Sequence, residues 1–167
     1  MTQPHQIDKQ GIRMRARAAI VRDGAILLVA FDDENGFHYN LPGGGVEPGE
    51  TLYGTAIREV REETTADVEV KELLLVYECF PPDYGNYNGD HSLNFVFRCE
   101  LRERSEPCLP DTPDANEVAV HWIPFGEFPD APLVPKIQRR IIAALHEPNR
   151  DAFCMNPDIT DEIRSLK

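Results

Sequence analysis

The chain of 167 residues is within the size range of one compact domain, and we expect a single domain over residues 1–167. Seventeen basic and 29 acidic side chains give a net charge of −12, which opposes nonspecific attraction to nucleic acid or anionic membranes. The four cysteines lack metal-ligand spacing, and no long apolar stretch or signal-peptide core occurs, so we expect a soluble cytoplasmic protein without a zinc site or disulfide framework.

The first expected elements are two strands of a β-hairpin, because the runs RMRARAAIVR and AILLVAF flank the turn signal Asp23-Gly24. In the first run, Arg13, Arg15 and Arg17 alternate with small apolar residues. The period of two in a strand places these arginines on one face. Two interpretations stay open for that face, which is either exposed to solvent or a basic wall that contacts the phosphates of a substrate.

A short extended run at residues 38–42 and a glycine-rich loop at 43–50 come next, followed by a helix. Thr51 suits the N-cap of this helix because its hydroxyl can accept a hydrogen bond from the first turn. The helix carries an apolar stripe that we expect to face the core. The stripe consists of Tyr53, Ala56, Ile57 and Val60.

The second half of the chain alternates strand-like and irregular segments. Residues 67–80 and 91–103 are rich in β-branched and aromatic residues and are expected to be strands, separated by a loop at 81–90. An irregular connection at 104–116 precedes a strand at 117–124. Strands and helices therefore mix, which favours an α/β fold with helices packed on a mixed sheet.

A last helix is expected from about Pro135, which suits a first helical position, to Glu147. Its apolar residues at helical spacing are Ile137, Ile141, Ile142 and Leu145. The segment after Pro148 has no clear assignment.

Three glutamates concentrate on the first predicted helix, just after the glycine-rich loop. Helical spacing places Glu59, Glu62 and Glu63 along the edge of the apolar stripe. Like charges so close together repel, and a group of hard oxygen ligands suits Mg2+ or Mn2+. The alternative is a solvated acidic face that pairs with Arg58 and Arg61.

Residues 44–66 resemble the Nudix box, in which a glycine is followed after five residues by glutamate and after seven more by Arg-Glu, an aliphatic residue, any residue and Glu-Glu. The matching residues are Gly44, Glu50, Arg58, Glu59, Val60, Glu62 and Glu63. Thr65 and Ala66 depart from the closing glycine and aliphatic residue of the pattern. The departure affects the end of the helix, where the residue after the last turn often adopts a left-handed backbone conformation that is unfavourable for threonine. It removes no carboxylate. The similarity extends over about residues 13–147.

The resemblance implies a Nudix-type α/β/α sandwich and a Mg2+-dependent hydrolase, in which Mn2+ can replace Mg2+. It assigns Glu59 and Glu63 to metal binding, and Glu62 either to metal binding or to accepting the proton of the attacking water. Arg58 orients the glutamates through charge-assisted hydrogen bonds. The Gly43 carbonyl is implied as a further metal ligand.

Glu117 lies where some relatives of this family place another acidic catalytic or metal-binding residue. The alternative is an ordinary exposed glutamate before a strand.

The substrate implied by the resemblance is a small-molecule nucleotide. We expect cleavage of a nucleoside diphosphate linked to another moiety, with ADP-ribose or a nucleotide sugar favoured. Arg15, Arg17 and Tyr84 are the expected substrate-binding residues. Pro81 and Tyr84 match cues that accompany different substrates in the family, ADP-ribose and dinucleoside polyphosphates, so they do not decide between them.

The resemblance also allows other functions. One is a (d)NTP pyrophosphohydrolase, and another is a nucleotide-sensing module that binds without cutting. An enzyme for capped RNA ends is disfavoured by the acidic charge balance, so nucleic acid is not an expected partner, and neither is a membrane. The resemblance also allows a homodimer, although the sequence shows no interface.

Overall fold

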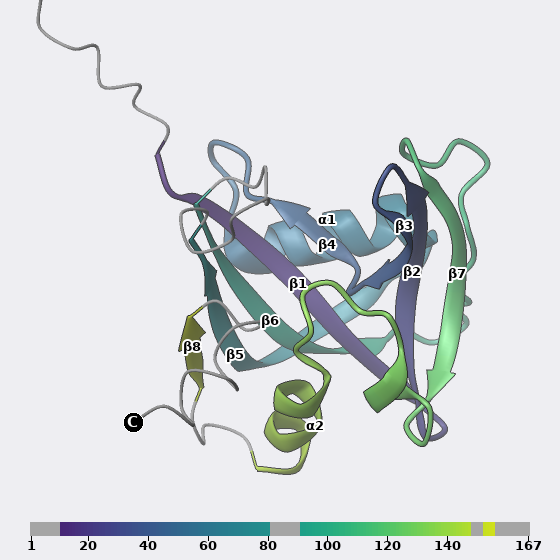
Figure 1. Cartoon of the computed structure of the whole chain (residues 1–167). Coiled ribbons are helices and arrows are strands. Elements are labelled where there is room, and N and C mark those ends of the chain that lie inside the picture. Colours follow the sequence, from purple (N-terminus) through teal and green to yellow (C-terminus); the bar gives the residue numbers. More distant parts are fainter. Residues whose placement is uncertain (1–10, 81–90, 148–151, 156–167) are drawn as a thin grey trace, which may run out of the picture.

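The protein is described by a computed structural model over residues 11–80, 91–147 and 152–155 (Figure 1). Its elements in chain order are β1 (Arg13–Arg22), β2 (Ala25–Asp33), β3 (Gly36–Asn40), β4 (Gly43–Gly45), α1 (Leu52–Thr64), β5 (Val68–Cys79), β6 (Ser92–Leu101), β7 (Glu117–Pro124), the short 3-10 helix η2 (Phe128–Asp130), α2 (Gln138–His146) and β8 (Phe153–Met155).

The strands form a mixed sheet in the order β3-β2-β1-β6-β5-β8. β1 and β6 run parallel at its centre, and β5 pairs antiparallel with β6. β7 pairs with β2, and β4 pairs with β1. The predicted strands at 67–80, 91–103 and 117–124 are therefore confirmed, and the segment between β6 and β7 is irregular as expected.

The predicted hairpin of β1 and β2 is confirmed. Asp23 and Gly24 form its turn, with φ of 51° and 75°. Val21 pairs with Ile26 next to that turn. Farther along β1, the partner on that side is β4, so the hairpin leaves room for a third segment beside β1.

The glycine-rich segment after β3 was expected to be a loop, and that prediction is wrong for its first three residues. Gly43–Gly45 form β4, which pairs antiparallel with β1 at Arg17 and Arg15. Gly43 has a φ of 141°, and a Cβ there would overlap the carbonyl oxygen of Ala16. The absence of a side chain lets the backbone of β4 approach β1 closely.

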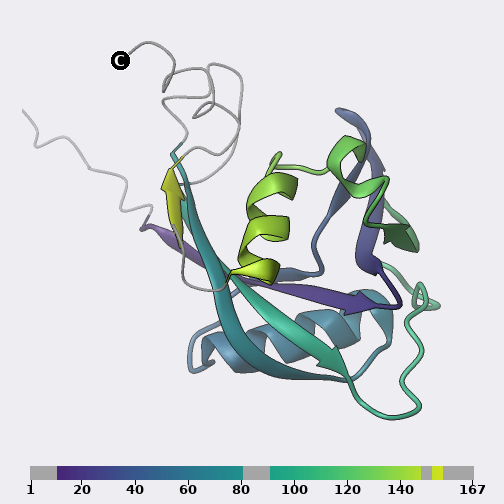
Figure 2. The same cartoon turned by 90° about the horizontal axis from the view of Figure 1, so that it is seen from below.

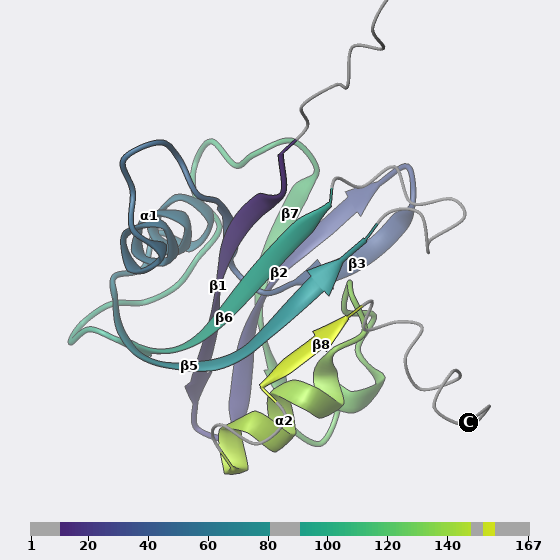
Figure 3. The ribbon, with the colours of Figure 1, turned by 90° about the vertical axis from the view of Figure 1, so that its left-hand side faces the viewer.

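Two helices cover opposite faces of the sheet, as predicted for an α/β/α sandwich (Figures 2 and 3). Alternate residues of β1 divide between two cores, because successive side chains of a strand point to opposite faces. Ala18 and Ile20 pack with α1, whereas Ala19 packs with the core beneath α2. All three are fully buried.

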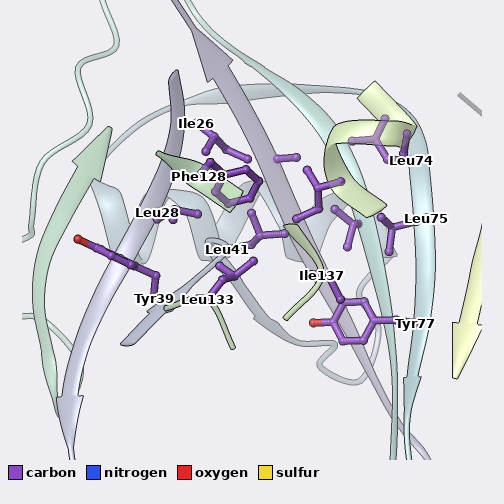
Figure 4. Packing of buried hydrophobic residues seen from close by; sticks show 14 of the residues in the cluster. Ile26, Leu28, Tyr39, Leu41, Leu74, Leu75, Tyr77, Phe128, Leu133 and Ile137 are labelled. Atoms are coloured by element: carbon purple, nitrogen blue, oxygen red, sulfur yellow. The ribbon is translucent and has the colours of Figure 1, made fainter. Parts of the chain in front are cut away.

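The core beneath α2 is the larger of the two (Figure 4). β2, β5, η2 and α2 all contribute to it. Its members include Ile26, Leu28, Tyr39, Leu41, Leu74, Leu75, Tyr77, Phe128, Leu133, Ile137 and Ile141. This core packs α2 and η2 against the face of the sheet that lies opposite α1.

α1 begins as predicted, because the Thr51 hydroxyl accepts a hydrogen bond from the Gly54 amide at 3.0 Å. Ala56 and Val60 are buried, but Tyr53 is 50% exposed, so its predicted place in the core is wrong. The Tyr53 ring instead contacts Phe97 edge to face at the rim. The buried face of the helix includes Glu63, which is only 9% exposed.

The end of α1 resembles a glycine-capped helix although the sequence has threonine there. Thr65 has φ 57° and ψ 0°, the left-handed conformation, and its amide donates to the Arg61 carbonyl. Thr65 therefore ends the helix in a conformation that favours glycine, although its β-branched side chain makes that region unfavourable.

α2 starts at Gln138 rather than at Pro135, so the predicted start is wrong. The preceding segment is held in extended form beside β3. The Tyr39 amide donates to the Pro132 carbonyl, and the Val134 amide donates to the Tyr39 carbonyl, both at 2.9 Å. Ile137 and Ile141 are buried as expected. No helix in the described ranges is long and apolar enough to cross a membrane.

Replacing Ile20 by alanine tests the packing of β1 against α1. Ile20 is fully buried, so we expect the free energy of unfolding to fall by about 2–5 kcal/mol. Ile12 is 53% exposed, and Ile12→Ala should change it by less than about 0.5 kcal/mol. Urea denaturation of both variants measures these values, and similar losses in the two would contradict the packing described.

Candidate functional site

The glycine strand and the acidic helix meet at two glutamates. The Gly43 amide donates a hydrogen bond to Glu63 Oε2 at 2.8 Å. A Cβ on Gly44 would overlap the carboxylate of Glu59. β4 and α1 are therefore packed so closely that the Glu59 carboxylate occupies the space of a missing side chain.

Glu63 is a buried carboxylate whose proton affinity is unusually high. Burial raises its pKa from 4.5 to about 8, against the opposing effects of the Arg17 charge and the Gly43 amide. The negative charges of Glu117 and Glu59 raise it further. These three glutamates therefore lie close enough to influence one another.

Glu59 has 14% of its side chain exposed, and its pKa is raised mainly by burial. Arg58 lowers that pKa through a hydrogen bond and its charge, while Glu62 raises it. Because burial outweighs the arginine, the site favours either a proton or another cation next to Glu59.

Glu117 belongs to the same cluster, although it comes from a distant part of the sequence. It is the first residue of β7, and only 6% of it is exposed. Its pKa is raised by burial first and also by the charges of Asp114 and Glu59, against a hydrogen bond from the Asp114 amide. The interpretation of Glu117 as an ordinary exposed glutamate is therefore wrong.

Arg58 holds the carboxylates of the helix and the loop together. Its Nε and Nη2 donate to the two oxygens of Glu50 at 2.7 and 2.9 Å. Its Nη1 donates to Glu59 Oε1 at 2.8 Å and to Glu62 Oε2 at 2.9 Å. A further bond reaches the Gly45 carbonyl at 3.1 Å.

Glu50 anchors Arg58, a role that was not predicted from the sequence. The two bonds from Arg58 hold its pKa at about 2, with the Arg58 hydrogen bond as the largest cause. Thr55 donates a further hydrogen bond to it at 2.8 Å. Its fixed place in the Nudix pattern was the signal, because a charged anchor for Arg58 is needed on the loop.

Glu62 differs from the other glutamates of the helix because its side chain is 58% exposed. It is attached to the cluster through Arg58 Nη1. The same Arg58 nitrogen donates to the exposed Glu62 and to the more buried Glu59, which sets the spacing of the two carboxylates.

Arg17 points toward the cluster. Its Nη1 donates to the carbonyls of Gly43 and Leu41, the latter at 3.3 Å. Its charge favours the ionised forms of Glu59 and Glu63. The Arg17 Nε is buried and has no hydrogen-bond partner within the described residues. For Arg17, the solvated-face interpretation of the strand is therefore wrong.

Arg15 is half-buried two positions before Arg17 on the same face of β1, opposite Gly45. Arg13, at the start of the strand, is exposed. Tyr84 and Pro81 lie outside the described residues. The structure therefore brings together Gly43, Glu59, Glu63, Glu117 and Arg17, with Glu62 held at the rim.

The donor set fits a hard divalent cation. Buried carboxylates that repel one another, next to a backbone carbonyl, are oxygen ligands of the kind that Mg2+ prefers. Within the described ranges, no three acidic, histidine or cysteine side chains are grouped as a ready metal site. Glu59 is instead bonded to Arg58, and Glu63 to the Gly43 amide.

Comparison with known proteins assigns the fold and this segment to one family. The NUDIX domain profile matches residues 12–145. Nudix hydrolase 8 of Arabidopsis thaliana is 28% identical over 111 residues, which cover 62% of this chain and 27% of the relative. The chain spans between 27% and 35% of the length of the curated relatives it matches.

Two solved structures extend the comparison to the whole fold. A MutT NUDIX hydrolase from Burkholderia pseudomallei is 28% identical, with a TM-score of 0.65, covering 79% of this chain and 97% of that one. A NUDIX hydrolase from Nitrosomonas europaea, 24% identical with a TM-score of 0.69, covers 84% of this chain and 92% of that one. The latter likeness shows the shared fold.

The raised pKa of Glu63 predicts how the stability of the metal-free protein depends on pH. Between pH 4.5 and about 8, the folded protein holds a proton that the unfolded chain releases. This stabilising contribution is complete below pH 4.5 and is lost as the pH rises through about 8. We expect the melting temperature, measured with a chelator present, to fall across this window.

The variant Glu63→Gln lacks this titration and serves as the control. Its melting temperature should fall less over the same pH range, with a remaining fall from Glu59 and Glu117, whose pKa values are also raised. Equal pH dependence in the two proteins would contradict the assignment to Glu63.

Proposed function

The chain belongs to the Nudix family, and on that premise we propose that it is a metal-dependent hydrolase of the diphosphate linkage in a small nucleotide. The observation that carries this proposal is the carboxylate cluster of Glu59, Glu63 and Glu117 beside Gly43, in which Glu63 and Glu117 are buried and Glu59 is partly buried. Burying like charges without a partner is costly, and a divalent cation offsets that cost.

Glu59 and Glu63 would hold Mg2+, or Mn2+ in its place, together with the carbonyl of Gly43. Glu117, the first residue of β7, would supply a further carboxylate. When bound, such an ion neutralises charge on the phosphate oxygens and lowers the pKa of a coordinated water. The family generally uses divalent cations, which agrees with the choice of ligands.

Arg58 acts on the carboxylates rather than on the substrate. Its bonds to Glu59 and Glu62 set their positions, and its two bonds to Glu50 fix the guanidinium itself. A bidentate arginine–carboxylate pair is rigid and directional, so the helix and loop are held in one arrangement. Arg58 is therefore a positioning residue.

Glu62 would contribute a metal ligand or accept the proton of the attacking water. Its exposure and its bond through a single oxygen to Arg58 support this role, because the other oxygen is not used by that bond. Water that enters from solvent would meet this carboxylate before the buried members of the cluster.

Positive charges beside the acidic cluster support a substrate that carries phosphate groups. Arg15 and Arg17 lie on the same face of β1, next to β4, and planar guanidinium groups suit phosphate oxygens. We propose a nucleoside diphosphate joined to another moiety, of the ADP-ribose or nucleotide-sugar type. The alternative is a (d)NTP, which offers a triphosphate to the same residues.

Product release from a substrate panel tests the proposed reaction. The panel contains ADP-ribose, nucleotide sugars, dinucleoside polyphosphates and each (d)NTP, with Mg2+, Mn2+ or a chelator. We expect a nucleoside monophosphate from the first two classes, abolished by the chelator. Cleavage confined to (d)NTPs would favour the alternative, and tight binding without cleavage would indicate a sensing module.

The variants Glu59→Gln and Glu63→Gln test the metal ligands directly. The ion is worth several kcal/mol of charge stabilisation, so each variant should lose more than about 100-fold of the metal-dependent turnover while keeping its fold. Turnover with Mg2+ and circular dichroism measure the two properties. Glu103→Gln, an exposed position outside the site, is the matched control. Near wild-type turnover in either site variant would remove that residue from the metal site.

A further inference from the structure

Arg17 and Gly43 face each other across the β1–β4 pair, and their contact joins the two strands at the site. Arg17 Nη1 donates to the Gly43 carbonyl, while the Gly43 amide donates to Glu63 Oε2. This glycine is thus bonded to an arginine through its oxygen and to a site glutamate through its nitrogen. The same arginine also reaches the Leu41 carbonyl at 3.3 Å, so it spans the start of the glycine segment.

The positive charge of Arg17 lies where the acidic cluster requires a cation. Its charge acts on both Glu59 and Glu63, and the charge of Arg58 acts on Glu59 as well. The guanidinium therefore offsets part of the repulsion among the glutamates and occupies the Gly43 oxygen, the carbonyl assigned to the metal in the proposed function.

We infer that Arg17 is a placeholder for the metal ion: its guanidinium holds Gly43 in the metal-free protein and gives up that carbonyl when a divalent cation binds. The inference rests on the proposed function. A carbonyl oxygen has two lone pairs, but a guanidinium and a divalent cation on the same oxygen repel each other strongly in a partly buried site. One of the two must move, and the arginine has the flexible stem.

The displaced guanidinium has a use in the proposed reaction. Its Nε is buried without a hydrogen-bond partner in the described residues, so the resting position leaves a donor unsatisfied. A diphosphate beside the metal would offer oxygens to Nε and Nη together. Metal binding thus releases Arg17 to bind phosphate. Before that step, Arg17 is a positioning residue that holds β4 through the Gly43 carbonyl.

Calorimetric titration with Mn2+ alone tests the exchange without any substrate. Arg17→Met keeps an apolar stem and removes the competing guanidinium, so it should bind Mn2+ about tenfold more tightly than the wild-type protein. Arg22→Met is the matched control, because Arg22 is on the same strand and pairs with Glu106 at 3.0 Å instead of the cluster. Its affinity for Mn2+ should stay within about twofold of wild type.

Melting temperatures separate exchange from a general loss of stability. Arg17→Met should melt below the wild-type protein in the presence of a chelator, and the difference should shrink at saturating Mn2+, because the ion then takes over the carbonyl. If the methionine variant does not fold, Arg17→Gln provides a second neutral side chain with the same expectations.

Equal or weaker Mn2+ binding by the folded Arg17 variants would overturn the inference, and so would a melting deficit that Mn2+ leaves unchanged. If the wild-type protein binds Mn2+ and the variants bind it no better, the proposed function stands and only the exchange fails. If the wild-type protein does not bind Mn2+, the metal site of the proposed function fails together with the inference.

Discussion

The close approach of β4 to β1 on one side and to α1 on the other is the constraint on which the site depends. Gly43 has no room for a Cβ next to Ala16, and Gly44 has none next to Glu59. This packing brings a backbone amide to Glu63 and leaves Glu59 against the strand. A side chain at Gly43 would push β4 away from the backbone of β1, and one at Gly44 would displace the carboxylate of Glu59 from its position against the strand.

Burial of negative charge is the second feature that organises the molecule here. Glu63 and Glu117 are almost inaccessible to solvent, and the pKa values of both are raised by burial. Two arginines offset this negative charge in different ways. Arg58 is bound to four oxygens of carboxylates and one carbonyl and is fixed by them, whereas Arg17 has a donor without a partner in the described part of the chain. The site thus contains one arginine that is held rigidly, Arg58, and one that we infer to be movable, Arg17.

Local signals in the sequence predicted the structure correctly where a few neighbouring residues determine the backbone conformation. The Asp23-Gly24 turn and the Thr51 cap depend on neighbouring residues only, and both occur as expected. Predictions were wrong where tertiary contacts decide. Pro135 is not in the helix because β3 holds the preceding segment extended, and Tyr53 lies at the rim because the burial of α1 is centred on another side.

The acidic residues of the helix could be chosen from the Nudix pattern, but their environments could not. Helical spacing placed Glu59, Glu62 and Glu63 together without distinguishing the buried Glu63 from the exposed Glu62. The inward turn of Arg17 depends on β4 pairing with β1, which the glycine-rich segment did not indicate. Long-range pairing of this kind leaves no local mark in a sequence.

The position of a bound metal tests the central claim most directly. Crystals grown with Mn2+ and measured near its absorption edge would locate the ion by its anomalous scattering. We predict a peak within bonding distance of Glu59, Glu63 and the carbonyl of Gly43. A peak elsewhere on the molecule, or none at this cluster at a Mn2+ concentration that supports turnover, would contradict the assignment of these residues as the catalytic metal site.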